Sequence, residues 1–160
     1  MRRTSATGIE NRGGGFTLVE ILVVVAITGV VLAMAAVNLW PSDEEVAKRE
    51  SGMLALSLEK ARDAAWFGGR PTAVSFDAGR LRQWQLQADR SWQTDPALDR
   101  DLGGVSVRTF YLDGQPLPLD QRLVFLADGF GVPFRLQLEI RGLARAIEGD
   151  AAGAITVIAQ

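Results

Sequence analysis

The chain has 160 residues, with 17 lysine and arginine residues against 19 aspartate and glutamate residues, and it contains neither histidine nor cysteine. This composition excludes disulfide bonds, a catalytic thiolate, a histidine base and the usual zinc ligands. The formal net charge of -2 offers no surface for nucleic acid. We therefore expect a protein that is not an enzyme, needs no cofactor or metal, and binds no nucleic acid.

The amino-terminal residues 1–15 form a basic segment that ends in three glycines. Such a segment has the composition of a processing leader, and we exclude it from the fold. Residues 21–42 carry no charge, and a helix of that length rises roughly 30 Å, enough to cross the hydrocarbon of a bilayer. Positive charge ahead of the apolar run keeps this end in the cytoplasm and sends the carboxy-terminal part across. Trp40 and Pro41 are expected to end the span.

Glu20 stands at the start of this apolar run. A carboxylate inside a membrane-inserting segment costs about 3 kcal/mol or more, so Glu20 needs a partner. Cleavage between Gly15 and Phe16 would supply one, because the new α-amino group of Phe16 would lie one helical turn from Glu20, in the same chain or in a neighbouring chain.

The stretch Gly15-Phe16-Thr17-Leu18-Val19-Glu20, with a basic leader before it and about twenty apolar residues after it, resembles the class III signal of type IV prepilins and type II secretion pseudopilins. In that family a membrane-embedded prepilin peptidase cuts after the glycine and methylates the new phenylalanine amine. The resemblance therefore implies cleavage between Gly15 and Phe16, N-methylation of the Phe16 amine, and a role for Glu20 in assembly. It covers only the first quarter of the chain, and it indicates the assembly class rather than the individual protein.

Two other interpretations of the apolar run stay open. An ordinary signal peptide could end at the small-x-small pattern of residues 33–35, and an uncut signal anchor would keep the whole run. Neither explains an acid beside the glycine and phenylalanine of the cleavage motif. Sequencing of the mature amino terminus separates the three interpretations, because it would begin at Phe16, at Ala36 or at Met1.

Residues 42–69 carry the pattern of a second, amphipathic helix. Ser42 is expected as its N-cap, with Glu45 as the capping-box partner three residues later. Gly68 and Gly69 supply a left-handed cap, and Pro71 prevents continuation. Its apolar stripe is expected to pack on a sheet as core rather than to form a site, and consists of Ala47, Leu54, Leu58, Ala61 and Ala65.

After Pro71 the pattern changes from helical to alternating. A hairpin is expected from strands 72–76 and 81–88, with one face buried and the other exposed to water. In the second strand, Trp84 and Leu86 share their side-chain parity with Arg82. Residues 91–104 are expected to form a loop. Further strands are expected over residues 105–112, with clean alternation, and over 122–127, 133–140 and 154–159, with an edge strand or irregular crossing at 115–119. The sequence thus predicts about seven short strands after the helices.

These elements predict an α+β fold, in which a long amino-terminal helix, first transmembrane and then amphipathic, packs on an antiparallel β-sheet or small β-sandwich, as in type IV pilin-like proteins. The expected domains are a cleaved leader (1–15), a transmembrane and filament-core helix (16–41), an amphipathic helix (42–69) and a periplasmic β domain (70–160).

The carboxy-terminal part carries a second, weaker resemblance. Residues 125–129 leading into residues 133–136, and a late turn at residues 148–153 before the last strand, are similar to the H-type minor pseudopilins, the GspH/FimT family. The major pseudopilin has fewer strands after its helix, and the tip-capping pseudopilin lacks a glutamate equivalent to Glu20. Both differences favour a minor subunit that carries this glutamate.

This resemblance implies a minor pseudopilin of the type II secretion pseudopilus, which helps to export folded proteins and links the tip to the shaft. It implies a single-pass protein of the bacterial inner membrane with a periplasmic carboxy-terminal domain, which later joins the periplasmic pseudopilus. The implied partners are the prepilin peptidase, the inner-membrane assembly platform and the other pseudopilins, both major and tip minor subunits. The alternative is a minor pilin of a type IV pilus in adhesion, motility or DNA uptake, although residues 149–160 contain no basic residue to hold DNA.

Two chemical sites remain to be weighed. Asp95, Asp99 and Asp101 alternate as calcium ligands can, but the segment lacks the glycine and terminal glutamate of an EF-hand loop, and a solvated acidic loop is favoured. An enzyme could pair Asp128 with the acids of residues 148–150. Aspartates in turns are ordinary, however, and the sequence contains no nucleophile motif or phosphate loop.

Overall fold

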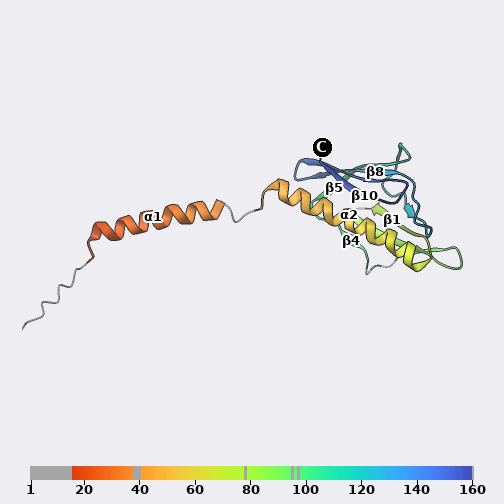
Figure 1. Cartoon of the computed structure of the whole chain (residues 1–160), viewed down its shortest axis with the longest axis horizontal. Helices are drawn as coiled ribbons and strands as arrows, with labels where there is room; N and C mark the ends of the chain where they lie inside the picture. Colours follow the sequence, from red (N-terminus) through yellow and green to blue (C-terminus); the bar gives the residue numbers. More distant parts are fainter. Residues whose placement is uncertain (1–15, 38–40, 78, 95, 97, 160) are drawn as a thin grey trace, which may run out of the picture. The chain divides into compact units, whose positions relative to one another are not determined.

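The computed structural model describes residues 16–37, 41–77, 79–94, 96 and 98–159. Gly15 and the rest of the expected leader lie outside the described residues, as do Trp40 and Asp95. The chain divides into two compact units between Pro41 and Ser42 (Figure 1). The first unit holds one helix, and the second holds the rest of the secondary structure.

Helix α1 (Leu18–Val37) forms the first unit. It begins at a capping residue, Thr17, whose hydroxyl accepts a hydrogen bond of 3.2 Å from the backbone N–H of Glu20. From Leu18 to Ala35 its side chains are all exposed. Because the helix is apolar all round rather than on one face, its stability depends on what surrounds it.

Helix α2 (Asp43–Gly68) opens the second unit with the predicted capping box. The backbone N–H of Glu45 donates to the hydroxyl of Ser42 over 3.2 Å, and the N–H of Ser42 donates to the carboxylate of Glu45 over 2.9 Å. Gly69 ends the helix in the left-handed conformation, with φ of 60°. The predicted start, end and buried stripe of this helix are all confirmed, and the buried stripe also includes Val46, Ser51 and Ala55.

Two five-stranded antiparallel sheets make up the rest of the second unit. The first sheet contains β1 (Thr72–Asp77), β2 (Arg80–Leu86), β3 (Trp92–Thr94), β4 (Arg100–Asp101) and β7 (Leu123–Phe125), in the order β3-β2-β1-β7, with β4 also paired to β2. The second contains β5 (Val105–Leu112), β6 (Gln115–Leu117), β8 (Phe134–Ile140), β9 (Leu143–Gly149) and β10 (Ile155–Ala159), in the order β10-β9-β8-β5-β6.

The core lies where α2 meets the two sheets. Helix α2 packs against β1 and β7 of the first sheet and against β8, β9 and β10 of the second (Figure 1). Strand β8 alternates between buried and half-buried side chains along its whole length, as its sequence predicts. The predicted α+β class is confirmed, with both sheets antiparallel. Among the largest fully buried side chains are Leu54, Leu58, Val74, Phe110, Leu136 and Ile147.

The strand predictions fail in three places. The described residues contain ten strands rather than about seven. Residues 91–104 include the short strands β3 and β4, which pair with β2, and β9 forms between the predicted strands 133–140 and 154–159. The alternation expected over β5 is broken by a bulge at Arg108, which lies between the paired residues Val107 and Thr109. Because of the extra residue, side chains face the core at odd-numbered positions before the bulge and at even-numbered positions after it. Val105 and Phe110 are therefore both buried.

Strand β2 carries apolar side chains on both faces. Leu81 is fully buried toward the core, whereas Trp84 pairs with Ala73 of β1 and lies on the other face, half-buried. Leu86 shares the outward parity of Trp84. The third discrepancy is therefore that this strand has no purely wet face.

Two ion pairs hold the start of α2 on the hairpin between β8 and β9. The guanidinium of Arg141 lies 3.0 Å from the carboxylate of Asp43. Arg145, whose side chain is buried, donates to the carboxylate of Glu44 and to the backbone carbonyl of Ala144. The first turn of α2 is thus fastened to the central strands of the second sheet.

Candidate functional site

The start of α1 carries the residues that the cleavage motif singles out. Phe16 is 76% exposed, and the side chain of Glu20 is exposed in the first turn of the helix. An acid at this position faces the positive end of the helix dipole. Among the described residues, no cation forms an ion pair with Glu20. Its carboxylate is therefore free to meet an amine, while the bond after Gly15 lies outside the description.

Thr17 is a residue that the sequence reasoning missed. Its hydroxyl caps α1, which places Glu20 at the third helical position, where a glutamate can turn back toward the residues before the helix. The signal was present as the pattern threonine-x-x-glutamate over residues 17–20, the same capping-box pattern that predicted the start of α2. The cap fixes the beginning of the helix next to Phe16, the residue whose amine cleavage would free.

The length of α1 is sufficient for a membrane span. Residues Leu18–Ala35 form a window that is apolar and long enough to cross a bilayer, and none of it is buried. A signal sequence near the amino terminus has the same length and composition. What separates the two interpretations is the acid in the first turn together with the cleavage motif before it.

A second apolar surface lies on the outer side of α2. With 100° between successive residues, Leu56 and Phe67 lie opposite the buried Leu54 and Leu58. Leu56 is 49% exposed and Phe67 is 84% exposed. These side chains have no role in the core and are available to a neighbouring molecule.

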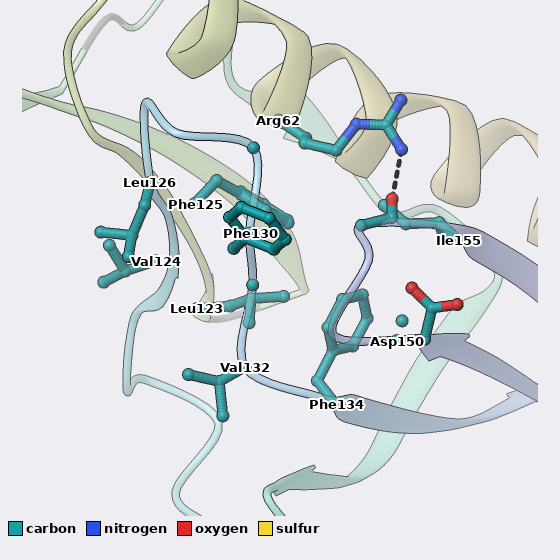
Figure 2. Close-up of a pocket in the computed structure, with 14 residues that line it drawn as sticks. Arg62, Leu123, Val124, Phe125, Leu126, Phe130, Val132, Phe134, Asp150 and Ile155 are labelled. Carbon is teal, nitrogen blue, oxygen red and sulfur yellow. Dashed lines mark hydrogen bonds between the residues drawn. The ribbon is translucent and has the colours of Figure 1, made fainter.

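The carboxy-terminal end of α2 meets two turns, which together we term the distal end: residues 126–133 between β7 and β8, and residues 150–154 between β9 and β10. Figure 2 shows Arg62 reaching from α2 to the second turn, where it donates to the carbonyl of Gly153. The backbone N–H of Gly131 donates to the carbonyl of Ala151 over 3.3 Å. The two stretches that suggested the H-type resemblance are thus packed against one another.

Close packing at the distal end requires glycine. A Cβ on Gly129, whose φ is 83°, would lie 1.8 Å from the ring of Trp66. A Cβ on Gly149 would lie 2.0 Å from the ring of Phe134. The pocket between these turns has free space of about 10 Å³, room for about one water molecule, so it is a seam of the fold rather than a ligand site.

The surface of the distal end is apolar. Phe130 is 68% exposed, Val132 45% and Leu126 44%, and Figure 2 shows Phe130 beside the seam. Together with Phe67 at the end of α2, they put four large apolar side chains on this end of the unit. Concentrated exposure of this kind marks contact sites in proteins that assemble.

The acids weighed for catalysis serve the turns instead. Asp128 accepts the N–H of Phe130 over 3.1 Å, and Asp150 accepts the N–H of Ala154 over 2.9 Å. Glu148 forms an ion pair of 2.9 Å with Arg135. Each carboxylate already has a structural partner, and the arrangement shows no acid and base facing a common substrate position.

The described part of the calcium candidate does not form a chelate. Asp101 accepts the N–H of Gly103 over 2.7 Å, as a turn residue does. Among the described residues, no group of three acids is close enough together to hold a metal ion. Asp95 lies outside these residues.

Comparison with known proteins gives a family match near the amino terminus and matches to solved structures. The family model of the prokaryotic N-terminal methylation motif matches residues 11–36. A search of curated proteins finds no significant match. Among solved structures, the minor pseudopilin EpsH from the type 2 secretion system of Vibrio cholerae is 26% identical, with a TM-score of 0.55, over 71% of this chain and 96% of that one.

Two further structures show the same fold. A crystal structure of the minor pseudopilin EpsH from Vibrio cholerae is 24% identical with a TM-score of 0.53, over 71% of this chain and 96% of that one. The solution structure of GspH from E. coli is 20% identical with a TM-score of 0.56, over 71% of this chain and 87% of that one. At these identities the two matches speak for the fold alone.

Proposed function

We propose that this chain is a minor pseudopilin of the GspH type in a type II secretion system, and that it joins the pseudopilus by burying α1 among the helices of neighbouring subunits. The methylation motif and the likeness to EpsH support this proposal. The observation that carries the proposal is that α1 is apolar on every side and exposed from Leu18 to Ala35, while an acid without an ion pair among the described residues occupies its first turn. Such a helix needs an apolar environment and a positive partner for the acid.

Removal of the leader supplies that positive partner. A prepilin peptidase would cut between Gly15 and Phe16 and methylate the Phe16 amine, and the secondary amine would keep its positive charge. Transfer of α1 from lipid to a filament core exchanges one apolar environment for another, so burial of apolar area gives it little direction. A buried pair between Glu20 and the Phe16 amine would instead set register and direction, a role that buried charges fill in other helical assemblies.

Mass spectrometry of the mature chain tests the processing step. We expect an amino terminus at Phe16 carrying one methyl group, in cells whose peptidase is active. The precursor would be a single-pass inner-membrane protein with residues 42–160 in the periplasm. A mature chain that begins at Met1 or Ala36 in secreting cells would overturn the proposal.

The assembly step is tested by Glu20→Ala. We expect the variant to be processed and to insert into the membrane, but to be lost from the filament, with secretion reduced at least tenfold. Glu45→Gln is the matched control, because this acid caps α2 in the second unit and has no part in the proposed pair between Glu20 and the Phe16 amine. Wild-type secretion by Glu20→Ala would refute the role of Glu20.

We further propose that the distal end contacts the tip-side subunits, while α1 joins the subunits of the shaft through the inner-membrane assembly platform. The exposed Leu126, Phe130 and Val132 support this proposal, because they cluster at the end of α2 remote from Ser42. The chain has no cysteine, so a disulfide cross-link from a single introduced cysteine identifies the subunit that lies next to that position. Phe130→Cys should cross-link to a tip minor pseudopilin carrying a cysteine, whereas Arg90→Cys should not; equal cross-linking of both would contradict the placement.

A further inference from the structure

The face of the first sheet that is turned away from α2 carries two tryptophans and an arginine. The hydroxyl of Thr72 in β1 donates to the carbonyl of Ala61 in α2 over 2.6 Å, so the side chain of Thr72 faces α2. Because side chains alternate along a strand, Ser75 lies on the face turned away from α2. On that side the indole N–H of Trp84 donates to the hydroxyl of Ser75 over 2.9 Å. Trp92, which pairs with Leu86, shares this face. With Arg122, these two tryptophans form what we term the outer cluster.

Arg122 contacts both indole rings. Its guanidinium carbon is 4.1 Å from the centroid of Trp84 and 5.7 Å from that of Trp92. Contacts at these distances are cation–π interactions, and they hold the planar guanidinium in one orientation. The three residues come from β2, β3 and the approach to β7, so the first sheet itself positions the arginine.

The hydrogen-bonding capacity of Arg122 is unused. Its Nε atom is buried without a hydrogen-bond partner. In the part of the chain that the structure describes, Arg122 is the one half-buried cation with no carboxylate partner, since the others of that class are paired: Arg62, Arg82, Arg100 and Arg135. A partly desolvated guanidinium with free donors binds a carboxylate strongly, through two parallel hydrogen bonds.

A surface pocket opens beside the cluster, lined by Trp92, Asp120, Gln121, Arg122 and Val124. Tryptophan and arginine dominate the residues that carry binding energy at protein–protein contacts. The exposed carboxylate of Asp120 adds a negative charge to the same wall, which disfavours multiply charged ligands such as phosphate or nucleic acid. The pocket therefore fits one acidic group attached to a chain that also covers the indole of Trp92.

We propose that the outer cluster binds an aspartate or glutamate side chain presented by a polypeptide partner, with the guanidinium of Arg122 holding the carboxylate and Trp92 contacting the chain around it. This site goes beyond the proposed assembly function, which uses α1 and the distal end. It lies on a different surface of the second unit. Binding at the cluster and entry into the filament can therefore fail separately.

The test uses the full chain in detergent micelles, labelled with nitrogen-15 at the indoles of its four tryptophans. The probe is a capped glycine peptide with one aspartate, and its twin, the control peptide, carries an asparagine instead. We expect saturable shifts of the Trp84 and Trp92 indole signals, with a dissociation constant on the order of 1 mM, and no shifts with the twin or with inorganic phosphate. Trp84→Phe and Trp92→Phe assign the signals.

Variants separate recognition from simple packing of the arginine. Arg122→Lys keeps the charge but loses the planar fork, and should weaken binding about tenfold. Arg70→Gln removes an exposed arginine and should leave binding unchanged. Asp120→Asn changes an exposed side chain outside the stack and should tighten binding about threefold, because it removes a like charge. This last variant keeps the test decisive even if Arg122→Lys disturbs the sheet.

Two results would overturn the proposal. The first is the absence of a saturable shift both in the wild-type chain and in Asp120→Asn. This result would mean that Arg122 only packs against the two rings and binds no carboxylate. The second is an equal response to the asparagine twin or to phosphate, which would mean that the cluster does not recognise a carboxylate on a polypeptide.

Discussion

Helices α1 and α2 follow one another in the chain, yet they obtain their stability in opposite ways. From Leu18 to Ala35, α1 has only exposed side chains, most of them apolar. Helix α2 has one buried stripe, a capping box at its start and a glycine cap at its end. The comparison teaches that α2 belongs to a folding unit with its own core, whereas α1 must find its partners in lipid or in other chains.

The strongest test of this difference compares two leucines. Leu58→Ala should lower the free energy of unfolding of residues 42–160 by about 2–5 kcal/mol, because it empties a fully buried position between α2 and the sheets. Leu32→Ala, at a position 63% exposed, should leave that free energy unchanged. Urea unfolding followed by tryptophan fluorescence measures both, and an equal loss would show that α1 shares the core of the second unit.

Two glycines sharpen the same comparison. Gly149→Ala would put a methyl group 2.0 Å from the ring of the buried Phe134, and should destabilise the second unit by about 1–3 kcal/mol. Gly29→Ala meets no atom within 4 Å and should raise the helicity of α1 without moving the unfolding transition of the second unit. Circular dichroism and urea unfolding separate the two effects, and a neutral Gly149→Ala would contradict the close packing of the distal end.

A smaller effect is expected at the two caps. Ser42→Ala removes the hydroxyl that caps α2 and should cost the second unit about 1 kcal/mol. Thr17→Ala removes the equivalent hydroxyl of α1 and should leave that stability unchanged while fraying the helix near Phe16. Thermal unfolding of both variants checks the expectation, with Thr17→Ser as the variant that should restore the cap.

The smallest effect concerns a surface turn of the second unit. The Ser91 hydroxyl and N–H, at 2.6 Å and 2.9 Å, stabilise the Asp89 carboxylate and lower its pKa below the ordinary value of 3.8. A lowered pKa in the folded state gives stability above the unfolded value, which is lost as the pH falls through the folded value. The stability difference between wild type and Ser91→Ala should therefore shrink as the pH falls below about 4. A difference independent of pH would contradict this contact.

Local signals decided which parts of the fold could be predicted. The limits of α2 follow from residues that touch each other within a few positions, namely the capping box and the terminal glycines. Strands β3 and β4 could not be found this way, because three and two residues form a strand only when β2 lies beside them. The bulge in β5 did leave a trace, since the adjacent polar residues Arg108 and Thr109 interrupt the alternation.

The sites divide along the same line. The predictions for Gly15, Phe16 and Glu20 depend on a contiguous motif, and they stay predictions until the mature protein is sequenced. Trp84 and Trp92 are close in the sequence, on the neighbouring strands β2 and β3, but Arg122 follows much later, and only the strand order of the first sheet brings it to them. No spacing rule would have selected them, and one arginine does not stand out in a chain with 17 basic residues.

The two ion pairs at the start of α2 have a mechanical consequence. Any tension that arrives along the backbone from α1 enters the second unit at Ser42, directly before Asp43 and Glu44. Those acids are tied to Arg141 and Arg145 on a hairpin of two central strands, so the load passes at once from the helix into the middle of a sheet. When such a subunit is pulled through α1, the two ion pairs would transmit the force to the second sheet. They would keep the first turn of α2 from separating from that sheet.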